Sequence, residues 1–160
     1  MSTHRPVRAA IVGAGDVATI HYEAINAIEG AELVGIADTD PVALERAKDM
    51  TGLPGYATHE DLFDGVQPDV IHVCTPHDQH IQASIDALAA GIHVIQEKPI
   101  AHSIAEGERL VAAADAVPAG GPKIGICFQN RYNVSSQEAH RLLDEHGAGR
   151  ARVVLDMSAW

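Results

Sequence analysis

Short apolar runs alternate with amphipathic stretches along most of the chain. The apolar runs are typical of buried strands and lie at residues 7–12, 31–37, 70–74, 92–96 and 123–128. The stretches between them carry apolar residues at helical spacing, which predicts helices at residues 17–28, 42–50, 78–90 and 103–117. A short edge strand at 55–57 and a helical turn at 59–63 complete the series. Because strands and helices alternate, we expect an α/β fold with a doubly wound parallel sheet and right-handed crossovers.

The pattern changes after residue 128. A helix is predicted at residues 134–146, ended by Gly147, and an apolar strand at 152–157. No further strand follows to pair with it, although such an edge is normally paired or covered. We therefore expect residues 1–128 to form one domain, and residues 129–160 to be a crossover helix and the first strand of a C-terminal α/β domain that is largely absent. The alternative is that the apolar tail docks on a partner.

Composition narrows the classes of function. The chain has 160 residues, of which 46% are hydrophobic and 21% charged, as in ordinary globular proteins. Its net charge of −11 argues against nucleic acid or an anionic membrane as partner, because both would repel it. No apolar run is long enough to span a bilayer. The two cysteines, Cys74 and Cys127, close strand-like runs, so we interpret them as buried small hydrophobic residues and expect a cytoplasmic protein.

The first apolar run ends in a glycine-rich turn that is typical of dinucleotide-binding proteins. Its residues are Gly13, Ala14, Gly15, Asp16, Val17 and Ala18, which form the pattern Gly-x-Gly-x-x-Ala before a helix. Gly13 permits the tight turn, Gly15 lets the backbone approach a pyrophosphate, and Ala18 allows close packing of helix on strand. The helix N-terminus supplies partial positive charge and free N–H donors. We expect residues 13–17 to contact the cofactor.

The second apolar run ends at Asp38, where an acidic residue reads the ribose 2′-hydroxyl in such proteins. A carboxylate accepts hydrogen bonds from a free diol and repels a 2′-phosphate, so Asp38, with Thr39 beside it, favours NAD over NADP. No arginine adjoins Asp38 in the sequence to neutralise an extra phosphate. The alternative is that Asp38 and Asp40 only form a turn and cap the helix that begins near Pro41.

Two later strands also end in residues suited to a ligand crevice. One ends in Cys74-Thr75-Pro76 and the next in Glu97-Lys98-Pro99. Lys98 follows the carboxyl end of a parallel strand, where side chains project toward the ligand, and Pro99 restricts its backbone to extended geometry. Glu97 can pair with Lys98 or set its orientation. The alternative is a surface lysine beside a turn proline.

The histidines around the Thr-Pro turn have a simpler interpretation than a metal site. His77 and His80 lie on one face of the predicted helix, but no matching set of cysteine or carboxylate ligands is nearby, so we expect no metal. Asp78 is interpreted as the cap of that helix, and His72 as a core histidine with its hydrogen bonds satisfied.

Taken in order, these motifs resemble the glucose–fructose oxidoreductase/inositol dehydrogenase (Gfo/Idh/MocA) family over nearly the whole chain. The matching motifs are Gly13-x-Gly15-x-x-Ala18 followed by His21, the acidic end of the second strand, Thr75-Pro76-x-x-x-His80, Ala87-Leu88-x-Ala90-Gly91-x-His93-Val94, and Glu97-Lys98-Pro99. The resemblance implies an N-terminal NAD(P)-binding Rossmann fold and a C-terminal α/β domain whose open sheet covers the nicotinamide.

The resemblance also implies roles for single residues. Lys98 would be the catalytic lysine that orients the substrate hydroxyl and assists its deprotonation while hydride passes to the nicotinamide. His80 would pack beside the cofactor turn, and Gln129 would reach the nicotinamide and Arg131 the substrate. The alternative for Gln129 and Arg131 is that they belong to a helix-capping loop. The remaining expected cofactor contacts are Cys74, Thr75, Pro76 and Glu97. His77 stands where the family usually has Asn.

The expected function is NAD-dependent oxidoreduction of a secondary alcohol on a sugar or cyclitol, in a homo-oligomer if the second domain is present. The family completes its site with an Asp-x-Gly-x-His arrangement that does not occur in these 160 residues, so we expect the chain by itself to bind cofactor with little turnover. The short-chain dehydrogenases are excluded, because no tyrosine is followed by lysine four positions on. The alternative function is a non-catalytic NAD(H)-binding sensor or regulatory module.

Overall fold

The computed structural model describes residues 5–146 and contains a six-stranded parallel sheet in the order β3-β2-β1-β4-β5-β6. The strands are β1 (Val7–Val12), β2 (Ala31–Ala37), β3 (Gly55–Tyr56), β4 (Val70–Val73), β5 (His93–Glu97) and β6 (Ile124–Cys127). The helices are α1 (Asp16–Ala27), α2 (Pro41–Thr51), α3 (His59–Val66), α4 (His80–Ala89), α5 (Ile104–Asp115), the 3-10 helix η1 (Gln129–Tyr132) and α6 (Val134–His146). The predicted doubly wound α/β fold is confirmed.

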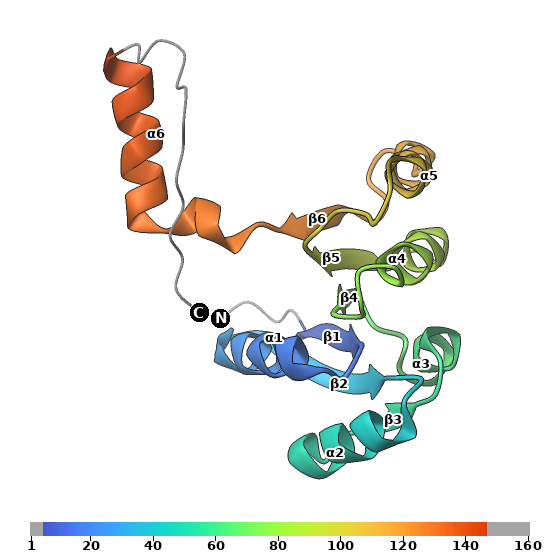
Figure 1. The fold of residues 1–160 in the computed structure, drawn as a ribbon. Helices are drawn as coiled ribbons and strands as arrows, with labels where there is room; N and C mark the ends of the chain where they lie inside the picture. Colours follow the sequence, from blue (N-terminus) through green and yellow to red (C-terminus); the bar gives the residue numbers. More distant parts are fainter. Residues whose placement is uncertain (1–4, 147–160) are drawn as a thin grey trace. The chain divides into compact units, whose positions relative to one another are not determined.

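Helices cover both faces of the sheet, and each face has its own core (Figure 1). On one face, α3, α4 and α5 pack through Leu62, Leu88 and Leu110 against the sheet. On the other face, α1 and α2 pack through Ile25 and Ala47. Successive residues of the central strands point to opposite faces and are buried on both, which explains why these strands read as continuous apolar runs.

The chain divides into two compact units, Met1–Cys127 and Phe128–Trp160. The sheet and helices α1 to α5 belong to the first unit, whereas η1 and α6 belong to the second. The predicted helix end at Gly147 and the strand at 152–157 lie outside the described residues. Within residues 5–146, no helix combines the length and hydrophobicity that crossing a membrane requires.

Two details of the sequence interpretation are wrong. Asp78 does not cap α4, because a turn closed by Gln79 N–H and Pro76 C=O, 2.8 Å from N to O, delays the helix until His80. Cys74 is buried as expected, but Cys127 is only half-buried because β6 is an edge strand. By contrast, Asp40 does cap α2, its carboxylate accepting a hydrogen bond from Val42 N–H at 2.9 Å.

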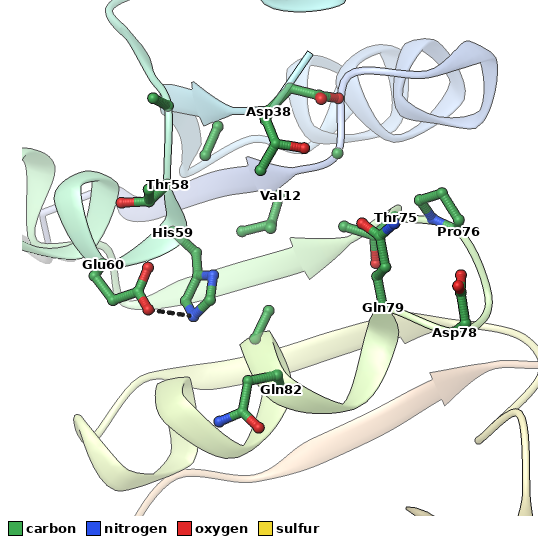
Figure 2. Close-up of a pocket in the computed structure, with 15 residues that line it drawn as sticks. Val12, Asp38, Thr58, His59, Glu60, Thr75, Pro76, Asp78, Gln79 and Gln82 are labelled. Carbon is green, nitrogen blue, oxygen red and sulfur yellow. Dashed lines mark ion pairs between the residues drawn. The ribbon is translucent and has the colours of Figure 1, made fainter.

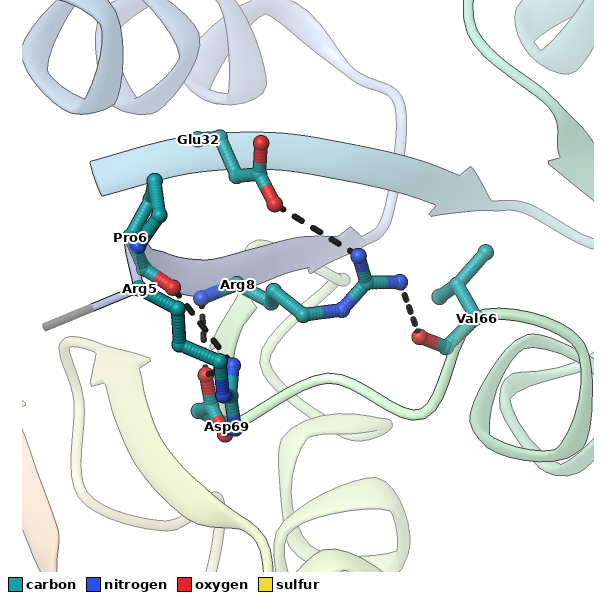
Figure 3. Close-up of polar contacts among 6 residues, drawn as sticks. All are labelled: Arg5, Pro6, Arg8, Glu32, Val66 and Asp69. Carbon is teal, nitrogen blue, oxygen red and sulfur yellow. Dashed lines mark hydrogen bonds and ion pairs between the residues drawn. The ribbon is translucent and has the colours of Figure 1, made fainter. Parts of the chain in front are cut away.

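A polar cluster closes the amino ends of the central strands (Figure 3). The guanidinium of Arg5 donates two hydrogen bonds of 2.6 and 2.7 Å to the carboxylate of Asp69, and Arg8 N–H donates a third at 2.9 Å. The Arg8 guanidinium donates to the C=O of Val66 at 2.6 Å and lies 3.4 Å from the Glu32 carboxylate. Hydrogen bonding from Arg5 lowers the pKa of Asp69. This cluster ties β1 to the start of β4 at the edge opposite the carboxyl ends of the strands.

Candidate functional site

The strand register brings the predicted site residues to one edge of the sheet. Ala37 of β2 is level with Val12 of β1, Val12 with Val73 of β4, and Val73 with Gln96 of β5. The residues that come next along these strands are Asp38, Gly13, Cys74, and Glu97, the last residue of β5, followed by Lys98, and they lie along the carboxyl edge. The order β3-β2-β1-β4 places the reversal of strand order between β1 and β4, which is where open α/β sheets bind ligands.

Gly13 sits where this edge is tightest. Its φ of +97° lies in a region that side chains rarely adopt, and a Cβ there would lie 2.6 Å from both Cys74 C and Thr75 N. Its N–H donates to the C=O of Ala37 at 2.8 Å. Only glycine therefore fits between the two turns that flank the switch point.

Gly15 is glycine for a different reason. It is the N-cap of α1, where no described side chain makes a capping hydrogen bond. Apart from the adjoining residues of its own chain segment, no described heavy atom lies within 4 Å of the place a Cβ would occupy. Asp16 and Val17 in the first turn are exposed. No side chain among the described residues therefore caps the first amides of α1, which leaves those of Asp16 and Val17 available to an anion.

Asp38 lies beside this loop and faces a pocket of about 400 Å³ (Figure 2). Its Oδ2 accepts a hydrogen bond from Ala14 N–H at 2.6 Å, and its Oδ1 accepts one from Asp40 N–H at 2.8 Å. Figure 2 shows Asp38 on one side of the pocket and Gln79 and Gln82 on the other. The predicted site residues in its lining are Gly13, Asp38, Thr39, Thr75 and Pro76. Each Asp38 oxygen keeps a lone pair for a ligand hydroxyl.

His80, the first residue of α4, contacts the turn formed by Thr75 and Pro76. It is 1% exposed, and its Nδ1 lies 3.1 Å from Thr75 Oγ1. Burial lowers the pKa of His80, which favours the neutral ring. Its Nε2 has no hydrogen-bond partner among the described residues.

Lys98 is exposed and directly follows β5. The residue before it, Glu97, belongs to a buried series of polar contacts with His21 and His72. Glu97 Oε2 accepts a hydrogen bond from Lys98 N–H at 3.2 Å, and Glu97 Oε1 lies 3.0 Å from His21 Nε2. His21 Nδ1 in turn lies 2.8 Å from His72 Nδ1. Of the two predicted roles for Glu97, the structure has it set the backbone of Lys98, since no ion pair between the two side chains occurs within residues 5–146. His72 is confirmed as a core histidine with a hydrogen-bond partner.

Three residues that support the site, Ser84, Gln96 and Arg46, are not predicted from the sequence. The carboxamide of Gln96, which is fully buried, accepts a hydrogen bond from Ser84 Oγ at 2.8 Å and donates one to the C=O of Ile100 at 2.9 Å, which fixes the turn after Lys98. A polar residue at an inward strand position is the signal that could have revealed Gln96. Arg46 donates from Nη2 to the C=O of Ala14 at 3.3 Å. The residues next to Asp38 in the sequence do not predict this contact of Arg46.

Gln129 and Arg131 lie in η1, in the second unit, which is described by itself. Two other groups of possible metal ligands each bring their donor atoms within 4.8 Å of one another in the described part of the chain: His21, Glu97 and Cys127, and His59, Glu60 and Asp86. His77 and His80 belong to neither group.

Comparison with known proteins agrees with this geometry. A family model described as an oxidoreductase family with an NAD-binding Rossmann fold (GFO_IDH_MocA) matches residues 7–118. The chain is 30% identical over 85% of its length to D-glucoside 3-dehydrogenase of Escherichia coli, of which it covers 38%. It is 26% identical over 92% of its length to inositol 2-dehydrogenase of Rhizobium meliloti, of which it covers 44%.

Solved structures show the same similarity. The WlbA dehydrogenase from Chromobacterium violaceum, in complex with NADH and UDP-GlcNAcA, superposes on 93% of this chain with a TM-score of 0.84 and 35% identity, over 43% of its own length. The scyllo-inositol dehydrogenase from Lactobacillus casei, with bound NAD(H) and scyllo-inositol, superposes on 91% with a TM-score of 0.81 and 27% identity, again over 43% of its length. The chain thus spans less than half the length of these relatives.

Proposed function

Since this chain belongs to the GFO_IDH_MocA family of oxidoreductases with an NAD-binding Rossmann fold, we propose that it is the cofactor-binding part of an NAD-dependent dehydrogenase. The substrate would carry a secondary alcohol on a sugar or cyclitol ring. That substrate class is supported by the relatives, which include a glucoside dehydrogenase and inositol dehydrogenases. The proposed division is a cofactor domain at residues 1–128 and the start of a substrate domain at residues 129–160.

The observation that carries the proposal is the arrangement around Gly13. The tight contact of Gly13 with the Cys74–Thr75 peptide leaves no side chain between the two turns, and the uncapped start of α1 opens beside it. The Asp38 carboxylate stands at the adjacent strand end. This combination fits a dinucleotide, because backbone donors suit a pyrophosphate and a carboxylate suits a ribose diol.

The chain's own residues would divide the binding as follows. The amides of residues 13–17 would hold the pyrophosphate, and Asp38 and Thr39 the adenosine ribose, which favours NAD over NADP. Thr75 and Pro76, positioned by Cys74 and His80, would flank the dinucleotide where it crosses the switch point. Glu97 and Gln129 would contribute contacts toward the nicotinamide end.

Lys98 would serve as the catalytic residue. When bound, NAD⁺ would supply the hydride acceptor for the carbon that carries the hydroxyl, so the alcohol would become a ketone and one proton would be released. Lys98 Nζ would orient the hydroxyl and assist removal of its proton. The turn held by Gln96 and Glu97 would keep Lys98 at the carboxyl edge, where such a substrate would have to lie.

Calorimetric titration of the 160-residue chain with NAD tests the cofactor site directly. We expect binding, and an affinity about tenfold lower for Asp38→Ala, which is the scale of a lost charge-assisted hydrogen bond pair. Asp49→Asn, which removes the same charge from an exposed position on α2, is the matched control and should bind like the wild type. No heat from NAD, or equal affinities for Asp38→Ala and the wild type, would contradict the proposal.

A further inference from the structure

Arg46 reaches across from α2 to the glycine-rich loop. Its Nη2 donates to the C=O of Ala14 at 3.3 Å, and the N–H of the same Ala14 donates to Oδ2 of Asp38 at 2.6 Å. A guanidinium and a carboxylate therefore contact the two backbone polar groups of one residue. Ala14 thus links a cation to the carboxylate that is proposed to bind the ribose.

The charge of Arg46 is not used elsewhere in the described structure. The cations Arg5, Arg8, Lys48 and Arg141 each pair with a carboxylate. Arg46 forms no ion pair within residues 5–146, as is also true of Lys98, Arg109, Lys123 and Arg131, but Arg46 alone of these five contacts the glycine-rich loop through a hydrogen bond. Arg46 is also exposed, so its guanidinium can meet a ligand from solvent. In a chain with a net charge of −11, a local cation offsets part of the repulsion that an additional phosphate would meet.

The position of Arg46 suits a phosphate beside the ribose. Asp38 lines the first pocket, whereas Arg46, Ala14 and Gly15 line a second pocket of about 240 Å³. Among the described residues that line these two pockets, Arg46 is the one lysine or arginine. Because Asp38 and Arg46 both contact Ala14, a phosphate on the ribose hydroxyl that Asp38 contacts would be exposed to the charges of both side chains.

We propose that Arg46 is a second determinant of cofactor selection, which binds the 2′-phosphate of NADP and lets the chain accept NADP as a weaker ligand beside NAD. The inference rests on the proposed function and adds to it. Asp38 repels the phosphate and Arg46 attracts it, so the preference is set by the balance of this pair. Removing the Asp38 carboxylate shifts the balance to NADP, and that shift depends on Arg46.

The experiment is a set of calorimetric titrations at one fixed salt concentration. Each protein is titrated with NAD and NADP, and with the fragments 5′-AMP and 2′,5′-ADP, which differ only by the 2′-phosphate. The proteins are the wild type, Arg46→Gln, Arg46→Lys, Asp38→Ser and the double variant Asp38→Ser/Arg46→Gln. Lys48→Gln removes the same charge from the same helix, at a side chain paired with Glu45, and is the matched control. Circular dichroism verifies the fold of each.

Arg46→Gln should weaken NADP and 2′,5′-ADP by about tenfold and change NAD and 5′-AMP by less than about twofold. Asp38→Ser should strengthen NADP by about tenfold, and the double variant should lose that gain. Arg46→Lys should keep part of the NADP affinity, because its charge remains.

Three results would overturn the inference. One is equal weakening of NAD and NADP by Arg46→Gln, which would make Arg46 a support for the loop. Another is a loss of NADP affinity in Lys48→Gln as large as that in Arg46→Gln, which would mean that the overall positive charge of α2, and not a contact of Arg46, affects binding. The last is a gain for NADP that survives in the double variant. A wild type that binds NAD while Arg46 fails these tests leaves the proposed function standing, whereas a wild type that binds neither nucleotide overturns both.

Discussion

The imidazole Nε2 of His21 lies 3.0 Å from the carboxylate Oε1 of Glu97, although the two residues stand 76 positions apart in the sequence. His21 comes from α1 and Glu97 from the end of β5, and both are less than 10% exposed. The same carboxylate accepts a hydrogen bond from Lys98 N–H. The pair therefore joins the helix that follows the glycine loop to the strand that ends at the proposed catalytic lysine.

Breaking this pair should destabilise the first unit. We expect Glu97→Leu to lower the free energy of unfolding by about 3 kcal/mol, because a buried imidazole N–H loses its acceptor. Glu97→Gln keeps an acceptor oxygen and should cost about 1 kcal/mol. Urea unfolding followed by circular dichroism measures both, with exposed Glu108→Gln as control. Equal stability of Glu97→Leu and Glu108→Gln would show that the pair contributes nothing.

The burial of His72 should make stability depend on pH. Burial, and to a lesser extent the neighbouring His21, lowers the pKa of His72 from 6.5 to about 4. Between these values His72 is protonated in the unfolded chain and neutral in the folded chain. The free energy of unfolding should therefore fall as pH decreases from about 6.5 to 4. His72→Gln, which still offers His21 a hydrogen bond, should flatten this slope. Exposed His102→Gln should not, and an unchanged slope in His72→Gln would contradict the assignment.

Alanine at the two loop glycines should separate folding from binding. Gly13→Ala places a Cβ 2.6 Å from backbone atoms at a φ of +97°, so it should lower the free energy of unfolding by about 2 kcal/mol or more. Gly15→Ala adds a Cβ that meets no described heavy atom within 4 Å apart from the adjoining residues. It should therefore cost less than about 1 kcal/mol, yet weaken NAD by about tenfold, because the methyl group occupies the path of the pyrophosphate. Thermal unfolding and NAD titration of both variants test this, and a Gly15→Ala protein with wild-type NAD affinity would contradict it.

The cluster around Asp69 should matter for folding and not for binding. Asp69→Asn loses the ionic hydrogen bonds from Arg5 and should lower stability by about 1 kcal/mol, a modest value because the Arg5 side chain is 65% exposed. Since the folded pKa of Asp69 is lowered, its contribution is present above the unfolded value and is lost as pH falls through the folded value. NAD affinity at neutral pH should match the wild type. A loss of affinity would mean that the amino ends of the strands influence the opposite edge.

Much of the fold followed from local patterns in the chain. The apolar runs predicted five of the strands to within a residue or two, because strands buried on both faces must be apolar throughout. The loop Gly13 to Gly15 and the strand ends at Asp38, Thr75 and Lys98 were also identified, since glycine placement and strand periodicity are properties of neighbouring residues. The start of α4 was misplaced, because the turn that delays it depends on a backbone hydrogen bond.

The partners of these residues were decided only by the tertiary structure. The sequence placed His21 and Glu97 in separate motifs, and packing of α1 against the sheet brought them to 3.0 Å. No arginine adjoins Asp38 in the sequence, and the packing of α2 places the Arg46 guanidinium against the Ala14 carbonyl. Local sequence determines which residues stand at the ends of strands, because that depends on short-range periodicity. Which side chains meet there depends on strand order, register and helix packing, and these are long-range properties of the folded chain.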